Sequence, residues 1–162
     1  MIYAAIDTNV LVSALLNFDS NPGKVLISVL NGETIPLVNP EILAEYQEVL
    51  ARKKFRFPPK LVKIVMARLA ACSLNISDAS ADYPEVTDPK DRCFYAVTMS
   101  ERESEDALLV TGNIRHFPVK PFVVTPARFL EIIQAGKKQS ACFARPVPSS
   151  STALLGTLRV SE

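Results

Sequence analysis

The chain has 162 residues, enough for one domain of ordinary size with a single apolar core and a short extension. A hydrophobic fraction of 48% and a mean hydropathy of +0.17 exclude a chain that is disordered over most of its length. The net charge of the whole chain is +1. Residues 137–162 have four basic side chains and one acidic side chain, so this segment has a net charge of +3. The remaining body therefore carries −2 and does not hold nucleic acid by bulk electrostatic attraction alone.

The amino-terminal segment predicts a buried strand followed by two helices. Residues 1–6 form an almost uninterrupted apolar run that ends at Asp7, which is typical of a strand in a parallel sheet. Helical stretches follow at residues 10–16 and 24–30, and we expect residues 21–23 to break the chain between them. Ligands of open α/β sheets gather at the carboxyl ends of strands, so Asp7 is a candidate site residue.

The middle of the chain predicts two strands and two helices. Residues 34–38 favour a strand, and a helix follows over about residues 41–53. A basic link interrupted by prolines leads into another helix over about residues 60–72. Residues 74–76 indicate a short strand before the polar stretch of residues 77–87.

The carboxyl-terminal part continues the alternation. A helix is predicted over residues 88–102, the strongest strand of the sequence over residues 107–111, and a short strand over residues 122–124. A last helix extends from a Thr-Pro start at residue 125 to Gln134. This order predicts an α/β fold, a three-layer α/β/α sandwich around a central parallel sheet of four to five strands.

We assign residues 1–136 to one domain and residues 137–162, which have the composition of a linker, to a loosely ordered tail. The three cysteines, Cys72, Cys93 and Cys142, are widely spaced and form no CxxC motif. They indicate reduced thiols in a cytoplasmic protein, and a single histidine in the chain argues against a zinc site. No apolar run or leader directs the chain to a membrane.

Helical periodicity places Glu45 closest to the buried face of its predicted helix. The apolar stripe of that helix consists of Ile42, Leu43, Tyr46, Val49 and Leu50. Glu45 lies roughly 100° from the centre of the stripe, whereas Glu41 and Glu48 lie roughly 140° and 160° away. The alternative is an ordinary surface acid that is simply nearest to the core, and only agreement with other acids decides between the two.

Asp88 and Asp91 form a second acidic cluster. Asp88 precedes a proline, so helix capping is its favoured role, and Asp91 has the spacing of a capping-box partner. Asp91 also lies at helical spacing from Phe94, Tyr95 and Thr98, which aligns its carboxylate with a buried face. That alignment makes Asp91 a candidate for a shared cavity.

Asn113 follows the strongest predicted strand, and it is either a turn residue or a neutral oxygen ligand for a cation. Asp7 and Asn9 have an alternative role as caps of the helix that follows them. Carboxylates from separate segments stay ionised side by side only when a cation offsets their repulsion. Oxygen ligands without histidine or cysteine suit Mg²⁺ or Mn²⁺.

Four segments together resemble the PIN-domain family, and in particular its branch of toxin components of toxin–antitoxin systems, the VapC-like ribonucleases. These segments are residues 6–15, 40–50, 88–91 and 109–118. The resemblance covers about residues 1–135 and implies a metal-dependent endoribonuclease that hydrolyses RNA phosphodiester bonds with Mg²⁺ or Mn²⁺. It also implies an antitoxin protein as partner and, by analogy, a homodimer.

Residue by residue, the resemblance places the catalytic acids at Asp7, Glu45 and Asp91. The metal ligands that it implies are Asp7, Asp91, Glu45, Asp88 and Asn113, and the supporting polar residues are Asn9 and Thr111. Asn113 departs from the family pattern, because many members have a fourth acid at this position. A one-metal site and a two-metal site therefore both stay open.

The candidates for RNA binding are basic residues near these segments: Lys53, Lys54, Arg56, Lys60, Arg115 and His116. Each of them is equally well explained as a solvated surface charge. Phe55 and Phe57 either stack on bases or pack the basic link onto the body. The rival functions are a PIN-like module that binds RNA or a protein partner without cleavage, and a phosphatase with Asp7 as nucleophile, for which position 9 lacks the second acid.

Overall fold

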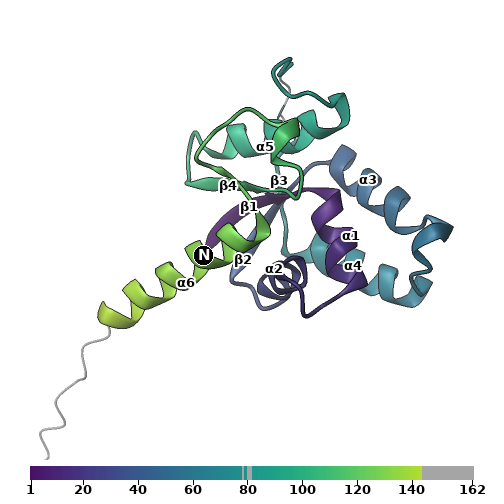
Figure 1. Cartoon of the computed structure of the whole chain (residues 1–162), viewed down its shortest axis with the longest axis horizontal. Coiled ribbons are helices and arrows are strands. Elements are labelled where there is room, and N and C mark those ends of the chain that lie inside the picture. The colour runs from purple at the N-terminus through teal and green to yellow at the C-terminus, as the bar shows by residue number, and fades with distance from the viewer. Residues whose placement is uncertain (78, 80–81, 144–162) are drawn as a thin grey trace, which may run out of the picture.

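A parallel sheet forms the centre of the molecule. The computed structural model describes residues 1–77, 79 and 82–143, and within them five strands pair in the order β3-β2-β1-β4-β5 (Figure 1). The strands are β1 (Ile2–Ile6), β2 (Thr34–Val38), β3 (Leu74–Asn75), β4 (Ala107–Val110) and β5 (Val123–Val124). Every neighbouring pair is parallel, which confirms the predicted sheet at the upper end of the expected strand number.

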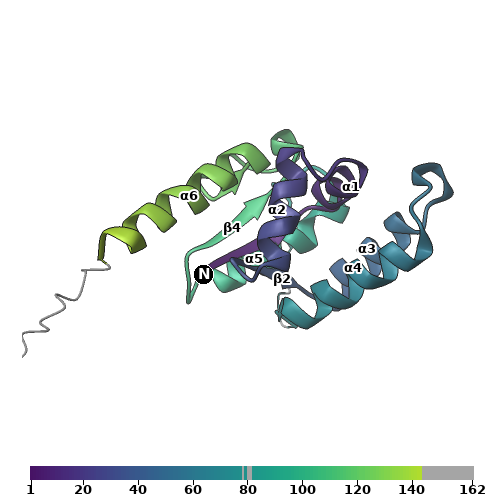
Figure 2. The same ribbon diagram turned by 90° about the horizontal axis from the view of Figure 1, so that it is seen from below.

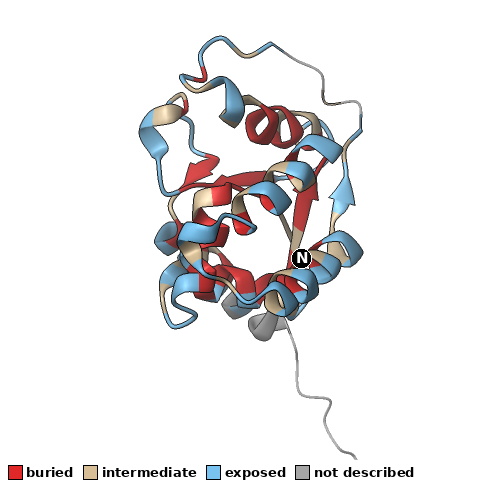
Figure 3. Ribbon diagram, turned by 90° about the vertical axis from the view of Figure 1, so that its right-hand side faces the viewer, coloured by how far each residue is buried: buried red, intermediate tan, exposed pale blue. Residues whose placement is uncertain are grey.

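Helices cover both faces of this sheet. They are α1 (Thr8–Leu16), α2 (Asn21–Leu30), α3 (Pro40–Leu50), α4 (Pro59–Cys72), α5 (Arg92–Glu101) and α6 (Pro126–Phe143). α5 packs against β1, β2 and β4, whereas α2 packs against β2 and against its neighbours α1, α4 and α6. α3 and α4 lie side by side (Figure 2). Buried residues line the strands and the helix faces turned toward them (Figure 3), as the three-layer prediction requires.

The connectivity creates a crevice at one edge of the sheet. β1 is central, with β2 on one side and β4 on the other, so the chain moves in opposite directions from β1. The carboxyl ends of β1 and β4 therefore flank a topological switch point, where open α/β sheets bind their ligands. Both strands are largely buried, which explains why their sequences are apolar without alternation.

The break expected at residues 21–23 is wrong, because these residues form the first turn of α2. The Ser20 hydroxyl accepts a hydrogen bond from the backbone N–H of Gly23 at 3.2 Å, and Pro22 lies in the first turn, where its missing N–H costs nothing. The Asn-Pro-Gly sequence therefore starts the helix. Gly23 is needed because a Cβ at this position would overlap the backbone of Phe18.

Replacing Gly23 with Ala is expected to lower the free energy of unfolding by about 1–3 kcal/mol, because the backbone of Phe18 must move to admit the methyl group. Urea denaturation of the wild type and of the variant measures this loss. Gly136→Ala is the matched control, since nothing lies near a Cβ at Gly136 and Ala favours the helix interior. A Gly23→Ala variant as stable as wild type would contradict the overlap.

The last helix extends further than the sequence predicts. Thr125 caps α6 as expected, with its hydroxyl accepting a hydrogen bond from the Arg128 backbone N–H at 3.2 Å, but the helix continues past Gln134 to Phe143. The Lys137 ammonium pairs with the Glu33 carboxylate at 2.7 Å and anchors the added turns. Residues 144–162 of the predicted tail lie outside the described residues. No described helix is both long enough and apolar enough to span a membrane.

Candidate active site

The carboxyl ends of β1 and β4 open into a cavity of about 660 Å³. Asp7 follows β1 directly, and Asn113 lies in the loop after β4. Polar side chains from four segments line this acidic cavity: Asp7, Asn9, Glu45, Asp88, Asp91, Asn113 and His116. The acids predicted from distant parts of the sequence therefore face one open space.

Asp7 is held by polar side chains that follow the two strands flanking the cavity. The Thr111 hydroxyl donates to Asp7 Oδ2 at 2.6 Å, and the Asn9 side-chain amide donates to the same oxygen at 2.7 Å. The Asn9 backbone N–H donates to Oδ1 at 3.2 Å, so Asp7 also caps α1. The Asn9 amide oxygen accepts a hydrogen bond from Gly112 N–H at 3.0 Å and joins the ends of β1 and β4. Asp7 thus has a fixed orientation.

Burial makes the ionised form of Asp7 costly. Asp7 is only 3% exposed, and this removal from water raises the pKa of its carboxyl group from 3.8 to about 6. The hydrogen bond from Thr111 lowers the pKa, whereas the nearby charges of Asp91 and Glu45 raise it. A group that is buried, oriented and reluctant to ionise is suited to a cation that neutralises it.

Glu45 is the least exposed of the three glutamates on α3, which confirms the periodicity argument. Its Oε1 accepts a hydrogen bond from the Thr8 hydroxyl at 2.7 Å. Burial raises the pKa of Glu45, and the charge of Asp91 raises it further. From helix α3, Glu45 lines the same acidic cavity as Asp7.

Tyr46 fixes the position of α3 beside the site. Its ring is 1% exposed, and its hydroxyl donates to the backbone carbonyl of Ile6, the last residue of β1. The ring also lies 6.1 Å from that of Phe94 on α5. This packing connects α3, which carries Glu45, with β1, which directly precedes Asp7, and with α5, which directly follows Asp91.

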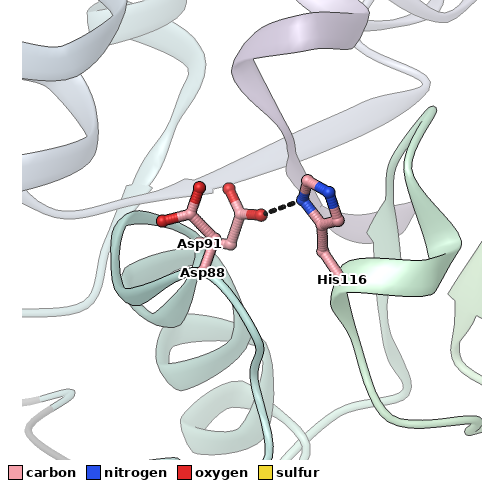
Figure 4. A group of neighbouring side chains, drawn as sticks. All are labelled: Asp88, Asp91 and His116. Atoms are coloured by element: carbon pink, nitrogen blue, oxygen red, sulfur yellow. Dashed lines mark hydrogen bonds and ion pairs between the residues drawn. The ribbon is translucent and has the colours of Figure 1, made fainter.

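Asp91 lies at the start of α5, where Phe94, Tyr95 and Thr98 are buried as predicted. Its Oδ2 is 2.8 Å from His116 Nδ1 (Figure 4), and its side chain is 13% exposed. Burial raises the pKa of Asp91, the hydrogen bond with His116 lowers it, and the charge of Asp88 raises it. The carboxylate therefore binds His116 and makes no capping hydrogen bond to α5.

Asp88 has the capping role that the sequence favours. Its Oδ1 accepts a hydrogen bond from the Lys90 backbone N–H at 3.0 Å and caps a short 3₁₀ turn over residues 89–91. Asp88 remains at the cavity wall together with Asp91. Its two roles are compatible because a carboxylate has a second oxygen free of the cap.

The donor atoms fit a divalent cation. Six carboxylates line the cavity, including those of Glu41 and Glu48. Burial raises the pKa of three of them, Asp7, Glu45 and Asp91, and a bound cation would lower these pKa values again. Among the described residues, the one group of three ligand atoms that lie within 4.8 Å of each other comes from Asp88, Asp91 and His116. Asp7 and Glu45 line the same cavity but do not belong to this group of three.

The predicted RNA-binding residues have different positions. Lys53 and Arg56 line a second cavity, between α3 and α4, and Arg115 is exposed. The Lys54 ammonium lies 4.8 Å from the centre of the Phe55 ring. His116 contacts Asp91. Arg52 and Lys90, which the sequence analysis did not single out, line the acidic cavity.

Phe55 and Phe57 pack the basic link onto the body, and Phe55 also reaches the acidic cavity. Their rings stack with centres 5.5 Å apart, and both pack against the edge of the core. Phe55 nevertheless lines the acidic cavity, so part of its ring faces the site. The free thiols Cys72 and Cys93 take no part in the site, and burial raises the pKa of Cys93 to about 12.

A comparison with protein-family models identifies the family of this chain. The sequence model of the PIN domain matches residues 3–115. The chain belongs to the PIN-domain family. The matched part of this PIN domain includes every acid of the cavity and ends one residue before His116. No curated protein and no solved structure matches the chain. PIN domains are nucleases that use divalent metals on nucleic-acid substrates, and the acidic cavity has the donor set for such a metal.

Proposed function

We propose that this PIN domain is a metal-dependent endoribonuclease that hydrolyses RNA phosphodiester bonds with Mg²⁺ or Mn²⁺. The observation that carries the proposal is the buried Asp7 carboxylate, held by Thr111 and Asn9 and facing the same cavity as Glu45 and Asp91. Such a set of acids is a poor binder of RNA phosphates by itself, because like charges repel. The same acids can bind an RNA phosphate through a divalent cation, whose positive charge offsets their repulsion.

Each acid has a distinct task in this proposal. Asp7 and Asp91 hold the cation, and Glu45, directed by the Thr8 hydroxyl, either helps to hold it or orients the attacking water. When bound, the cation supplies an activated water and neutralises charge on the phosphate. Lys90 and Arg52 on the cavity wall offer positive charge to the phosphates that flank the cut.

The resemblance to VapC-like ribonucleases supports the finer parts of the proposal. They are RNA as the substrate, a role as the toxin of a toxin–antitoxin system, an antitoxin protein as partner, a homodimer and a cytoplasmic location. The role of Lys53, Lys54, Arg56, Arg115 and His116 in RNA binding belongs to the same proposal. So does the division of the chain into a nuclease domain over residues 1–136 and a tail.

A circular RNA substrate tests the proposal, because only an endonuclease converts it to linear products. We expect cleavage with Mn²⁺ or Mg²⁺, no cleavage in EDTA, and recovery when excess Mn²⁺ is returned. Asp91→Asn should abolish cleavage. The control is Asp106→Asn, whose side chain is 91% exposed and pairs with Arg102 far from the cavity, and this variant should cleave normally.

The rival function makes a different prediction in the same assay. Asn113, in place of the acid found in many members, favours a PIN-like module that binds RNA or a protein without cutting it. That module would bind the circular RNA equally well in EDTA and leave it intact. Cleavage that persists in EDTA or in Asp91→Asn would remove the metal-dependent mechanism.

A further inference from the structure

Asp88, Asp91 and His116 form a compact cluster at one wall of the acidic cavity (Figure 4). The two carboxylates lie on the turn that precedes α5, and the imidazole ends a short 3₁₀ turn after β4. One donor atom from each residue lies within 4.8 Å of the other two. The cluster differs from the rest of the cavity because it contains a nitrogen donor.

Backbone contacts hold the two segments of the cluster together. The Thr87 backbone N–H donates to the carbonyl of His116 at 2.9 Å. On either side, Val86 and Phe117 are buried in the core at 0% and 5% exposure. These anchors fix the turn of Asp88 against the turn of His116, so the fold itself brings the donor atoms together.

The contact between His116 and Asp91 has the separation that one cation would require. Nδ1 and Oδ2 are 2.8 Å apart. Two donors at about 2.1 Å from the same ion and at right angles to each other lie about 3 Å apart. An ion can therefore replace the proton that the two atoms share with little movement of either side chain. His116 is accessible for this exchange, since its side chain is 41% exposed.

We propose that Asp88, Asp91 and His116 form a cation position that selects first-row transition ions such as Mn²⁺ over Mg²⁺. An imidazole nitrogen favours transition ions, whereas Mg²⁺ prefers a shell of oxygen ligands and water. The neutral Asn113 removes a carboxylate from this part of the cavity, and His116 supplies a further donor close by. This inference rests on the proposed function, because it names the class of ion used at the same cavity.

Metal binding without RNA tests the proposal. Mn²⁺ titration followed by electron paramagnetic resonance gives the affinity, and pulsed measurements of the bound ion detect a coordinated ¹⁴N nucleus. We expect a nitrogen signal in the wild type that is absent in His116→Gln. The Mn²⁺ Kd should rise about 10-fold or more in His116→Gln and in Asp88→Asn, while the Mg²⁺ Kd of His116→Gln changes less than about 3-fold.

Lys120→Gln is the matched control, because Lys120 is exposed and four positions from His116 but does not line the cavity. It should keep both the nitrogen signal and the Mn²⁺ affinity. Circular dichroism verifies that each variant is folded. A wild type without a nitrogen signal would overturn the proposal, and so would a His116→Gln variant that loses Mn²⁺ and Mg²⁺ affinity equally, the result expected if His116 only orients Asp91. Failure of RNA cleavage alone leaves these readouts unchanged and bears only on the proposed function.

Discussion

Replacing Asp7 with Asn is expected to reduce RNA cleavage by about 10³-fold or more. Asn has nearly the same shape as Asp and keeps one oxygen that can accept the hydrogen bond from Thr111 or Asn9. The substitution therefore removes the negative charge of the buried ligand and one of its two hydrogen-bond acceptors. Single-turnover cleavage of labelled RNA at saturating Mn²⁺ measures the effect on the chemical step.

Asp19→Asn is a suitable control for the charge change, because Asp19 is exposed and does not line the acidic cavity. This variant should cleave at the wild-type rate. A reduction of less than about 10-fold in Asp7→Asn would mean that the buried carboxylate is dispensable. The cavity would then lack the ligand on which the proposed mechanism depends.

The same Asp7→Asn substitution is expected to stabilise the metal-free protein by about 1–2 kcal/mol at pH 8, because the loss of one hydrogen-bond acceptor offsets part of the gain from removing a buried charge. Folding raises the pKa of Asp7 from 3.8 to about 6, mainly by burial. The folded state therefore disfavours the ionised form, and the stability present below about pH 4 is lost as the pH rises through about 6. A neutral Asn at this position does not incur that loss.

Urea denaturation in EDTA at several pH values measures this second effect. The gain in stability should be largest above pH 7 and should disappear near pH 4, where Asp7 is neutral in the folded state. Saturating Mn²⁺ should stabilise the wild type more than Asp7→Asn, because the variant lacks the negative charge of one proposed ligand. A variant that is less stable than wild type at pH 8 in EDTA, or a gain that is the same at every pH, would contradict the assigned cause.

The sequence predicts the fold well because its strongest signals are continuous apolar runs for the strands and apolar stripes for the helices. The apolar runs at β1 and β4 are typical of strands buried on both faces, and both lie at the centre of the sheet. The position of Glu45 follows from the stripe of α3 in the same way. Where the signal is local chemistry, prediction is weaker: the Asn-Pro-Gly of α2 reads as a break until Ser20 is seen to cap it.

The parts of the site that the sequence does not predict depend on contacts between distant segments. His116 and Asp91 are 25 positions apart on turns that have no common periodicity, so the sequence predicts only an RNA-binding role for His116. Thr8 lies 37 positions from Glu45, and its hydroxyl has no sequence pattern that marks it as a partner. Such pairs become visible only when the order of the strands is known.

The hydrogen bond between Thr111 and Asp7 joins residues separated by 104 positions. A fragment that stops before β4 would therefore retain Asp7, Glu45 and Asp91, yet it would lack the Thr111 hydroxyl that orients the first of these carboxylates together with Asn9. Truncation upstream of residue 107 should consequently yield inert pieces, and cleavage should return only if the missing strand is supplied in trans and docks beside β1. A partly synthesised chain would be harmless to cellular RNA until the fourth strand has emerged and paired.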